Sequence, residues 1–140
     1  MKHVVFLCPH NALRSVIAAS LFNQLAHGSA DAESAGTEPA EQVNERTIQV
    51  LREVGIEVGD EIPQRVSRPL LERADRVVTL TCPLDPELAA IAAHKIEDWS
   101  MPDTAGKPVD TVREVRELIR VRVEQLIAEL ADAPPPANWH

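Results

Sequence analysis

Short apolar runs alternate with longer amphipathic segments along the chain. The apolar runs 4–7 and 76–80 predict two buried strands, and residues 32–35 and 94–97 predict two shorter ones. Apolar residues that recur every three or four positions predict helices between and after these strands. The expected helices cover 15–26, 44–54, a short stretch from Pro69, part of 83–93, and 111 to the prolines at 134–136.

The ends of the first two helices carry recognisable capping signals. Ser15 is expected to cap the first helix and Asn44 the second, because short polar side chains accept hydrogen bonds from the free N–H groups of a first helical turn. His27-Gly28 and Gly55 are expected to end these helices.

The alternation of strands and helices predicts an α/β fold. We expect a three-layer sandwich, with a central parallel four-stranded sheet and helices on both faces. Residues 1–133 are expected to form one domain and 134–140 a flexible tail. Ligands of such folds bind outside the carboxyl ends of the strands, and the first of these ends lies at Cys8.

Composition narrows the range of partners. The formal net charge is −8, which disfavours nucleic acid and means that an anionic substrate needs a local positive pocket. No apolar run approaches the roughly 20 residues that span a bilayer, so no membrane contact is expected. Without a signal-peptide pattern, and with two cysteines expected as free thiols, the sequence predicts a cytoplasmic protein.

The loop between the first strand and the first helix carries the candidate chemistry. Backbone N–H groups and a helix N-terminus converge in such a loop, and they stabilise an anionic sulfur or a bound oxyanion. Cys8 is therefore the expected nucleophile. The planar guanidinium group of Arg14 is expected to bind two oxygens of the oxyanion, and Ser15 is expected to donate a hydrogen bond to the sulfur. Asn11 suits a left-handed turn position. The predicted anion-binding loop consists of Pro9, His10, Asn11, Ala12 and Leu13.

The spacing of Cys8, Arg14 and Ser15 resembles the signature of low-molecular-weight protein tyrosine phosphatases and of the related arsenate reductases. Similar family segments occur at 33–37, 44–56, 74–80 and 98–107, so the resemblance covers about residues 2–130. It implies that Asp103 is the general acid that protonates the leaving oxygen. The chain departs from the family at Pro9, which removes one N–H donor, at Leu13, and at Thr104, where the family has proline.

The two branches of the family differ in the second step of the reaction. A phosphatase lets water hydrolyse the phospho-cysteine, whereas a thiol-dependent arsenate reductase needs a second thiol. Cys82 follows a parallel strand, so it is expected at the same sheet edge as Cys8 and is the candidate resolving thiol. An inert, partly buried Cys82 is the alternative, in which case an external thiol resolves the adduct.

The arsenate reductase branch is the favoured interpretation. Residues 10–12, Trp99 and 103–106 resemble it, and the chain has no Tyr to stack on a phosphotyrosine ring. It implies a small oxyanion substrate, arsenate or phosphate, no bound cofactor, and an external reductant such as thioredoxin, glutaredoxin or mycoredoxin. A phosphomonoester or phosphotyrosine phosphatase is the second hypothesis, and a non-enzymatic anion-binding relative the third.

The sequence also contains residue types that bind metal ions. Cys8, His10, Cys82 and His94 supply suitable ligand types, but their spacing matches no standard metal-binding pattern. The sequence therefore predicts no bound metal.

Overall fold

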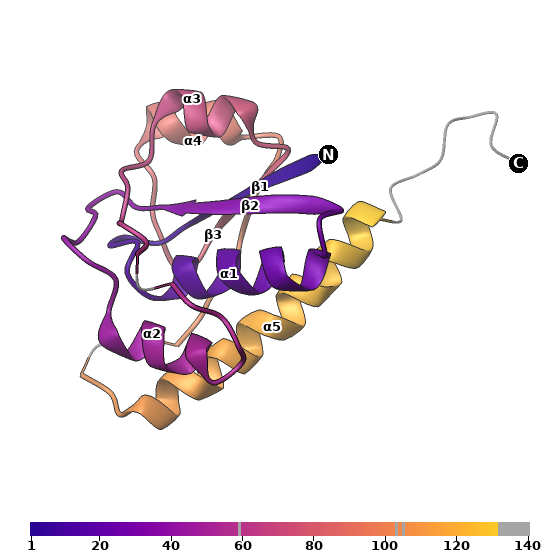
Figure 1. The fold of residues 1–140 in the computed structure, drawn as a ribbon. Helices are drawn as coiled ribbons and strands as arrows, with labels where there is room; N and C mark the ends of the chain where they lie inside the picture. The colour runs from indigo at the N-terminus through magenta and orange to yellow at the C-terminus, as the bar shows by residue number, and fades with distance from the viewer. Residues whose placement is uncertain (59, 103, 105, 132–140) are drawn as a thin grey trace, which may run out of the picture.

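A parallel β-sheet forms the centre of the molecule. The computed structural model describes residues 1–58, 60–102, 104 and 106–131. The strands are β1 (Lys2–Leu7), β2 (Ala30–Ala35), β3 (Arg76–Thr79) and β4 (Ile96–Asp98). They pair in the order β2-β1-β3-β4, and every pair is parallel. Figure 1 labels β1, β2 and β3 at the centre of the molecule. The expected four-stranded parallel sheet is confirmed.

Helices cover both faces of this sheet, which confirms the three-layer sandwich (Figure 1). One face carries α1 (Arg14–Ala26), α2 (Glu45–Arg52) and the long α5 (Val109–Ala131). The other carries α3 (Arg68–Arg73) and α4 (Pro86–Ala92).

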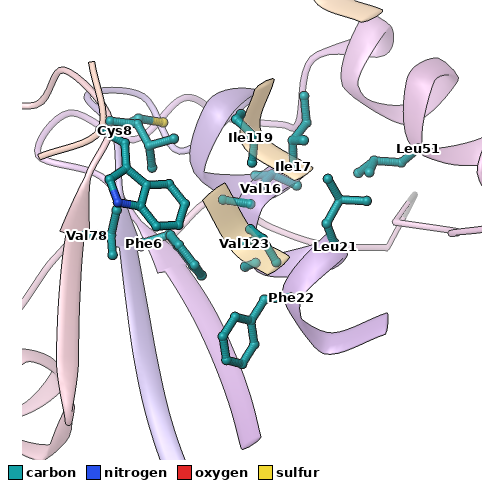
Figure 2. Packing of buried hydrophobic residues seen from close by; sticks show 14 of the residues in the cluster. Phe6, Cys8, Val16, Ile17, Leu21, Phe22, Leu51, Val78, Ile119 and Val123 are labelled. Atoms are coloured by element: carbon teal, nitrogen blue, oxygen red, sulfur yellow. The ribbon is translucent and has the colours of Figure 1, made fainter. Parts of the chain in front are cut away.

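The core follows from the alternation of side chains along β1. Val4 and Phe6 point toward α1 and α5, whereas Val5 and Leu7 point toward α3 and α4. Figure 2 shows Phe6 of the sheet facing the apolar side chains of α1 and α5. Phe6 is fully buried, and its ring centroid lies 6.0 Å from that of Phe22. Burial of one such side chain stabilises the fold by about 1.5–3 kcal/mol, so this layer holds the end of β1 firmly.

The helix ends confirm one predicted cap and correct another. Asn44 caps α2 by accepting a hydrogen bond from the amide of Arg46 at 2.8 Å. The prediction that Ser15 caps α1 is wrong: the cap position is Leu13, and Ser15 lies buried inside the first turn. Its hydroxyl group instead contacts the side chains of Cys8 and Asn11 in the preceding loop. His27 and Gly28 end α1 in left-handed conformations, as expected.

Several boundaries differ by one or two residues from the expected ones. β2 begins at Ala30 rather than at residue 32, and α5 begins at Val109 rather than at residue 111. Within the part of the chain that the structure describes, no helix is both long and apolar enough to cross a membrane.

Candidate active site

Cys8 lies directly after β1, at the carboxyl edge of the sheet, and Figure 2 shows it within the cluster of buried residues. Its sulfur is 3.0 Å from the Ser15 hydroxyl oxygen, and the Ser15 amide donates to it at 3.4 Å. Both contacts arise because the loop returns to the first turn of α1. Together they fix the position of the sulfur at the mouth of the loop.

Asn11 determines which way the Ser15 hydroxyl donates. The Asn11 Oδ1 atom accepts from the backbone amide of Gln64 at 2.8 Å, so its Nδ2 must face Ser15. This Nδ2 donates to the Ser15 oxygen at 2.9 Å. Because that oxygen already accepts a hydrogen bond, the hydroxyl proton is available to the Cys8 sulfur.

Asn11 also shapes the loop backbone. Its φ of 49° is left-handed, which confirms the predicted turn position. Only 2% of the residue is exposed, so its side-chain bonds are shielded from water. A buried amide with both polar atoms paired holds the loop in one conformation.

The loop carbonyl groups point toward the segment that follows β2. The Pro9 oxygen accepts from the Glu38 amide at 2.7 Å, and the His10 oxygen from the Ala40 amide at 2.9 Å. Among the described residues, no group accepts a hydrogen bond from the amides of residues 10–14. These amides and the start of α1 are therefore available to an anion. Pro9 supplies no N–H, as expected from its ring.

Gly36 allows β2 to pass close to this loop, a requirement that the sequence did not reveal. A Cβ atom at this position would lie 2.6 Å from the Pro9 oxygen and 2.8 Å from the Cys8 oxygen. Both are backbone atoms, which cannot move aside without displacing the loop. The only sequence signal was the similarity of 33–37 to the family's second strand and turn.

A pocket of about 260 Å³ opens above the sulfur. Its lining consists of residues 8–10 and 12–14 of the loop, Asn44 and Arg46 at the start of α2, and Thr104 and Gly106. Arg14 and Arg46 bring positive charge, and no described lining residue is acidic. Because its net charge is −8, the protein can bind an anionic substrate only in a locally positive pocket. The pocket above Cys8 meets this requirement.

Cys82 is the other free thiol, and it is 5% exposed. Burial raises the pKa of the Cys82 thiol above its ordinary value. Cys8 also raises this pKa, whereas Thr37 and Arg14 lower it. Cys82 follows β3 and Cys8 follows the neighbouring parallel strand β1, so both thiols lie at the same sheet edge, as the sequence predicted.

Asp103, the predicted general acid, lies outside the described residues. Trp99 is 2% exposed and packs on Phe6 with centroids 5.5 Å apart, so it belongs to the core. His10 contacts the Glu38 carbonyl oxygen at 3.0 Å through Nδ1. In the described part of the chain, no group of three potential ligand side chains is arranged to hold a metal ion.

A cysteine whose sulfur accepts hydrogen bonds at the mouth of a strand–loop–helix anion cradle defines a class of enzymes that form covalent bonds between cysteine and an oxyanion. Residues 3–134 match the family described as low molecular weight phosphotyrosine protein phosphatase, and the chain belongs to this family.

Three relatives show which branch of the family is similar. The chain is 29% identical to a glutaredoxin arsenate reductase of a Synechocystis strain, over 94% of this chain and 100% of that protein. The solved arsenate reductase of Archaeoglobus fulgidus is 36% identical, with a TM-score of 0.74 over 90% of this chain and 99% of the other. An arsenate reductase solved in a phosphate-binding state is 30% identical, with a TM-score of 0.82 over 92% and 98%.

Proposed function

We propose that this chain is a thiol-dependent arsenate reductase in which Cys8 is the nucleophile. The observation that carries the proposal is the Cys8 sulfur, 3.0 Å from the Ser15 hydroxyl, in a pocket that it shares with Arg14. The similarity to arsenate reductases over nearly the whole chain supports the choice of substrate.

The first step forms a covalent adduct. The Cys8 thiolate attacks arsenic(V), an As–S bond forms, and one As–O bond breaks. Arg14 and the free loop amides hold the remaining oxygens and the charge that develops on them. The departing oxygen leaves as water, and Asp103 is proposed to supply its proton, as the family resemblance implies.

The second step releases arsenite. A thiolate attacks the Cys8 sulfur, an S–S bond forms, and the electron pair of the As–S bond stays on arsenic, which becomes arsenic(III). Cys82 or an external thiol can supply this thiolate. The sequence contains only two cysteines, so an external thiol must reduce the resulting disulfide.

The reductant is a small thiol or a redox protein of the thioredoxin, glutaredoxin or mycoredoxin type, and no bound cofactor is required. Two free cysteines fit a compartment that keeps thiols reduced, so we place the reaction in the cytoplasm. The overall reaction converts arsenate and two thiols into arsenite, one disulfide and water.

Phosphatase activity is the second candidate. The family to which the chain belongs is described by its phosphatases, and a cradle for tetrahedral oxyanions also accommodates phosphate. Water would then hydrolyse the Cys8 adduct without a second thiol. A purely anion-binding protein is disfavoured, because the two hydrogen bonds at the Cys8 sulfur serve no purpose in simple binding.

A paired assay tests this order of preference. Arsenite release with an excess of thiol is compared with the hydrolysis of an aryl phosphate, for the wild-type protein and for the Cys8→Ser and Cys82→Ser variants. We expect thiol-dependent arsenite release that Cys8→Ser abolishes. Aryl phosphate turnover without arsenite release would establish the phosphatase instead, and turnover by Cys8→Ser would refute the mechanism.

A further inference from the structure

Two arginines differ from all others in the molecule. Arg14 and Arg46 are the only arginines whose guanidinium group has no hydrogen bond, ion pair or aromatic partner among the described residues. Both line the pocket above Cys8. Guanidinium groups in proteins ordinarily pair with planar anionic groups. Two guanidinium groups without such partners in one pocket therefore indicate a site for two anionic groups.

Arg46 is held at the pocket by the start of α2. Its backbone amide is fixed by the Asn44 side chain at 2.8 Å, and Asn44 itself donates from its amide to the Ala12 oxygen at 3.0 Å. The first turn of α2 is thus joined to the anion-binding loop. Arg46 is half-buried, in contrast to Arg52 on the same helix, which is paired with Glu57 at 2.9 Å and lies outside the pocket.

One oxyanion does not need both groups. Arg14 belongs to the loop itself and accompanies the free amides of residues 10–14, which form the cradle for the oxyanion. Arg46 comes from another element, and the pocket of about 260 Å³ is larger than a single tetrahedral oxyanion. Cys8 lines the same pocket, and its sulfur is where the second reactant of the proposed reaction must arrive.

We propose that Arg46 binds the carboxylate of a small thiol that attacks the Cys8 adduct directly. This inference rests on the arsenate reductase function proposed above. The thiolate attacks the Cys8 sulfur and forms a mixed disulfide, while the electron pair of the As–S bond remains on arsenic and arsenite leaves. A second molecule of the thiol then attacks the mixed disulfide, which releases the Cys8 thiolate and the disulfide of the small thiol.

The state of Cys82 supports this route. Cys82 is buried, and burial raises the pKa of its thiol, so little thiolate is present there at neutral pH. A small thiol that enters the open pocket does not share this restriction. Cys82→Ser is therefore expected to retain arsenite release with the small thiol.

Two small thiols that differ in charge isolate the contribution of the carboxylate. The second-order rate constant of arsenite release is measured with 3-mercaptopropionate, which is anionic, and with 2-mercaptoethanol, which is neutral. Arg46→Met is expected to lower the rate constant for 3-mercaptopropionate about tenfold, because it removes a partly solvent-exposed, charge-assisted hydrogen bond to the carboxylate. With arsenate kept saturating, the rate constant for 2-mercaptoethanol should change less than about twofold, because this neutral thiol has no charge for Arg46 to bind.

Matched variants complete the test. Arg46→Lys should restore part of the preference for the anionic thiol, and Arg52→Met, on the same helix but outside the pocket, should leave it unchanged. Equal losses with both thiols, or no loss with either, would each overturn the proposal. So would a wild-type protein that releases arsenite only with a reduced redox protein.

The two proposals fail in different ways. If the wild-type protein releases no arsenite with any thiol or redox protein, the arsenate reductase function fails and this inference falls with it. If arsenite is released but the ratio of the two rate constants does not depend on Arg46, only the carboxylate site is refuted.

Discussion

At the scale of single residues, Asn11 joins three parts of the site. It accepts from the amide of Gln64, donates to Ser15, and supplies the left-handed turn of the loop. The Ser15 hydroxyl in turn lies against the Cys8 sulfur. The orientation of the donor to the sulfur therefore depends on a residue that does not touch the sulfur itself.

Replacement of Asn11 should reduce both stability and activity. Asn11→Ala leaves the Gln64 amide without its partner, which costs about 1–3 kcal/mol, and forces a Cβ-bearing residue without a polar side chain into the left-handed region, which costs about 1–2 kcal/mol more. Asn11→Gly should incur only the first cost. Urea unfolding of both variants measures the difference, and equal stabilities would contradict the assigned backbone strain.

The loss of activity should be larger than the loss of stability suggests. Without the Asn11 donor, the Ser15 hydroxyl is free to turn away from the sulfur, and small misplacements at a reacting centre can cost about 100-fold in rate. Both variants are expected to lose activity to a similar degree. Full activity in Asn11→Gly would show that the hydrogen bond to Ser15 is not needed.

Some residues of the site could be predicted from the sequence and others could not. The left-handed turn at Asn11 was predictable, because Asn is one of the few residues that adopt this conformation readily. The contact between Ser15 and the Cys8 sulfur was predicted from the loop motif and is present at 3.0 Å. The place of Ser15 inside the first turn was not predicted, since a serine at the start of a helix is the usual sign of a cap. Gly36 and Arg46 act through contacts between distant segments, and no local pattern encodes these contacts. The role of Asp103 stays a prediction.

At the scale of elements, Glu53 connects the end of α2 to α5. Its carboxylate accepts hydrogen bonds from Arg113 at 2.7 Å and from Arg116 at 2.7 Å. Arg113 and then Arg116 lower the pKa of Glu53 to about 2. This contact stabilises α2, the helix that carries Arg46 to the pocket.

The stabilisation by Glu53 should depend on pH in a defined window. Because the folded state holds the pKa at about 2, below the ordinary value of 4.5, the contribution is fully present above about pH 4.5 and is lost as the pH falls toward 2. The unfolding free energies of wild type and Glu53→Gln should differ most at neutral pH and converge in acid. A difference that stays constant from pH 7 to pH 3 would contradict this assignment.

The element boundaries show where an apolar pattern is insufficient. The predicted second strand began at residue 32, but β2 begins two residues earlier, where it pairs with the polar start of β1. Here His3 lies between two carboxylates of β2, Asp31 at 2.6 Å and Glu33 at 2.7 Å. These polar contacts across neighbouring strands extend the ladder beyond its apolar part. The order and type of the elements were predictable, because they depend on periodicity alone.

At the scale of the whole molecule, the acidic side chains that the structure describes do not line the pocket. Many of them pair with arginines on the outer helices, as Glu117 and Glu124 do with Arg120 on α5. The pocket residues that the structure describes carry only neutral or basic side chains. A protein with a net charge of −8 therefore offers a positive site at one sheet edge. The net charge could be calculated from the sequence, whereas the spatial distribution of the charged side chains could be described only once the fold was known.

The central claim is that the Cys8 sulfur forms the bond to the oxyanion and is oxidised when arsenite leaves. It can be tested in a single turnover without oxygen, with arsenate and one equivalent of 3-mercaptopropionate, followed by tryptic mass spectrometry. Cys8 and Cys82 fall in separate tryptic peptides, residues 3–14 and 77–95. We expect the free thiol of Cys8 to disappear in proportion to the arsenite formed, and only when arsenate is present. Arsenite that accumulates while Cys8 remains a free thiol would contradict the account.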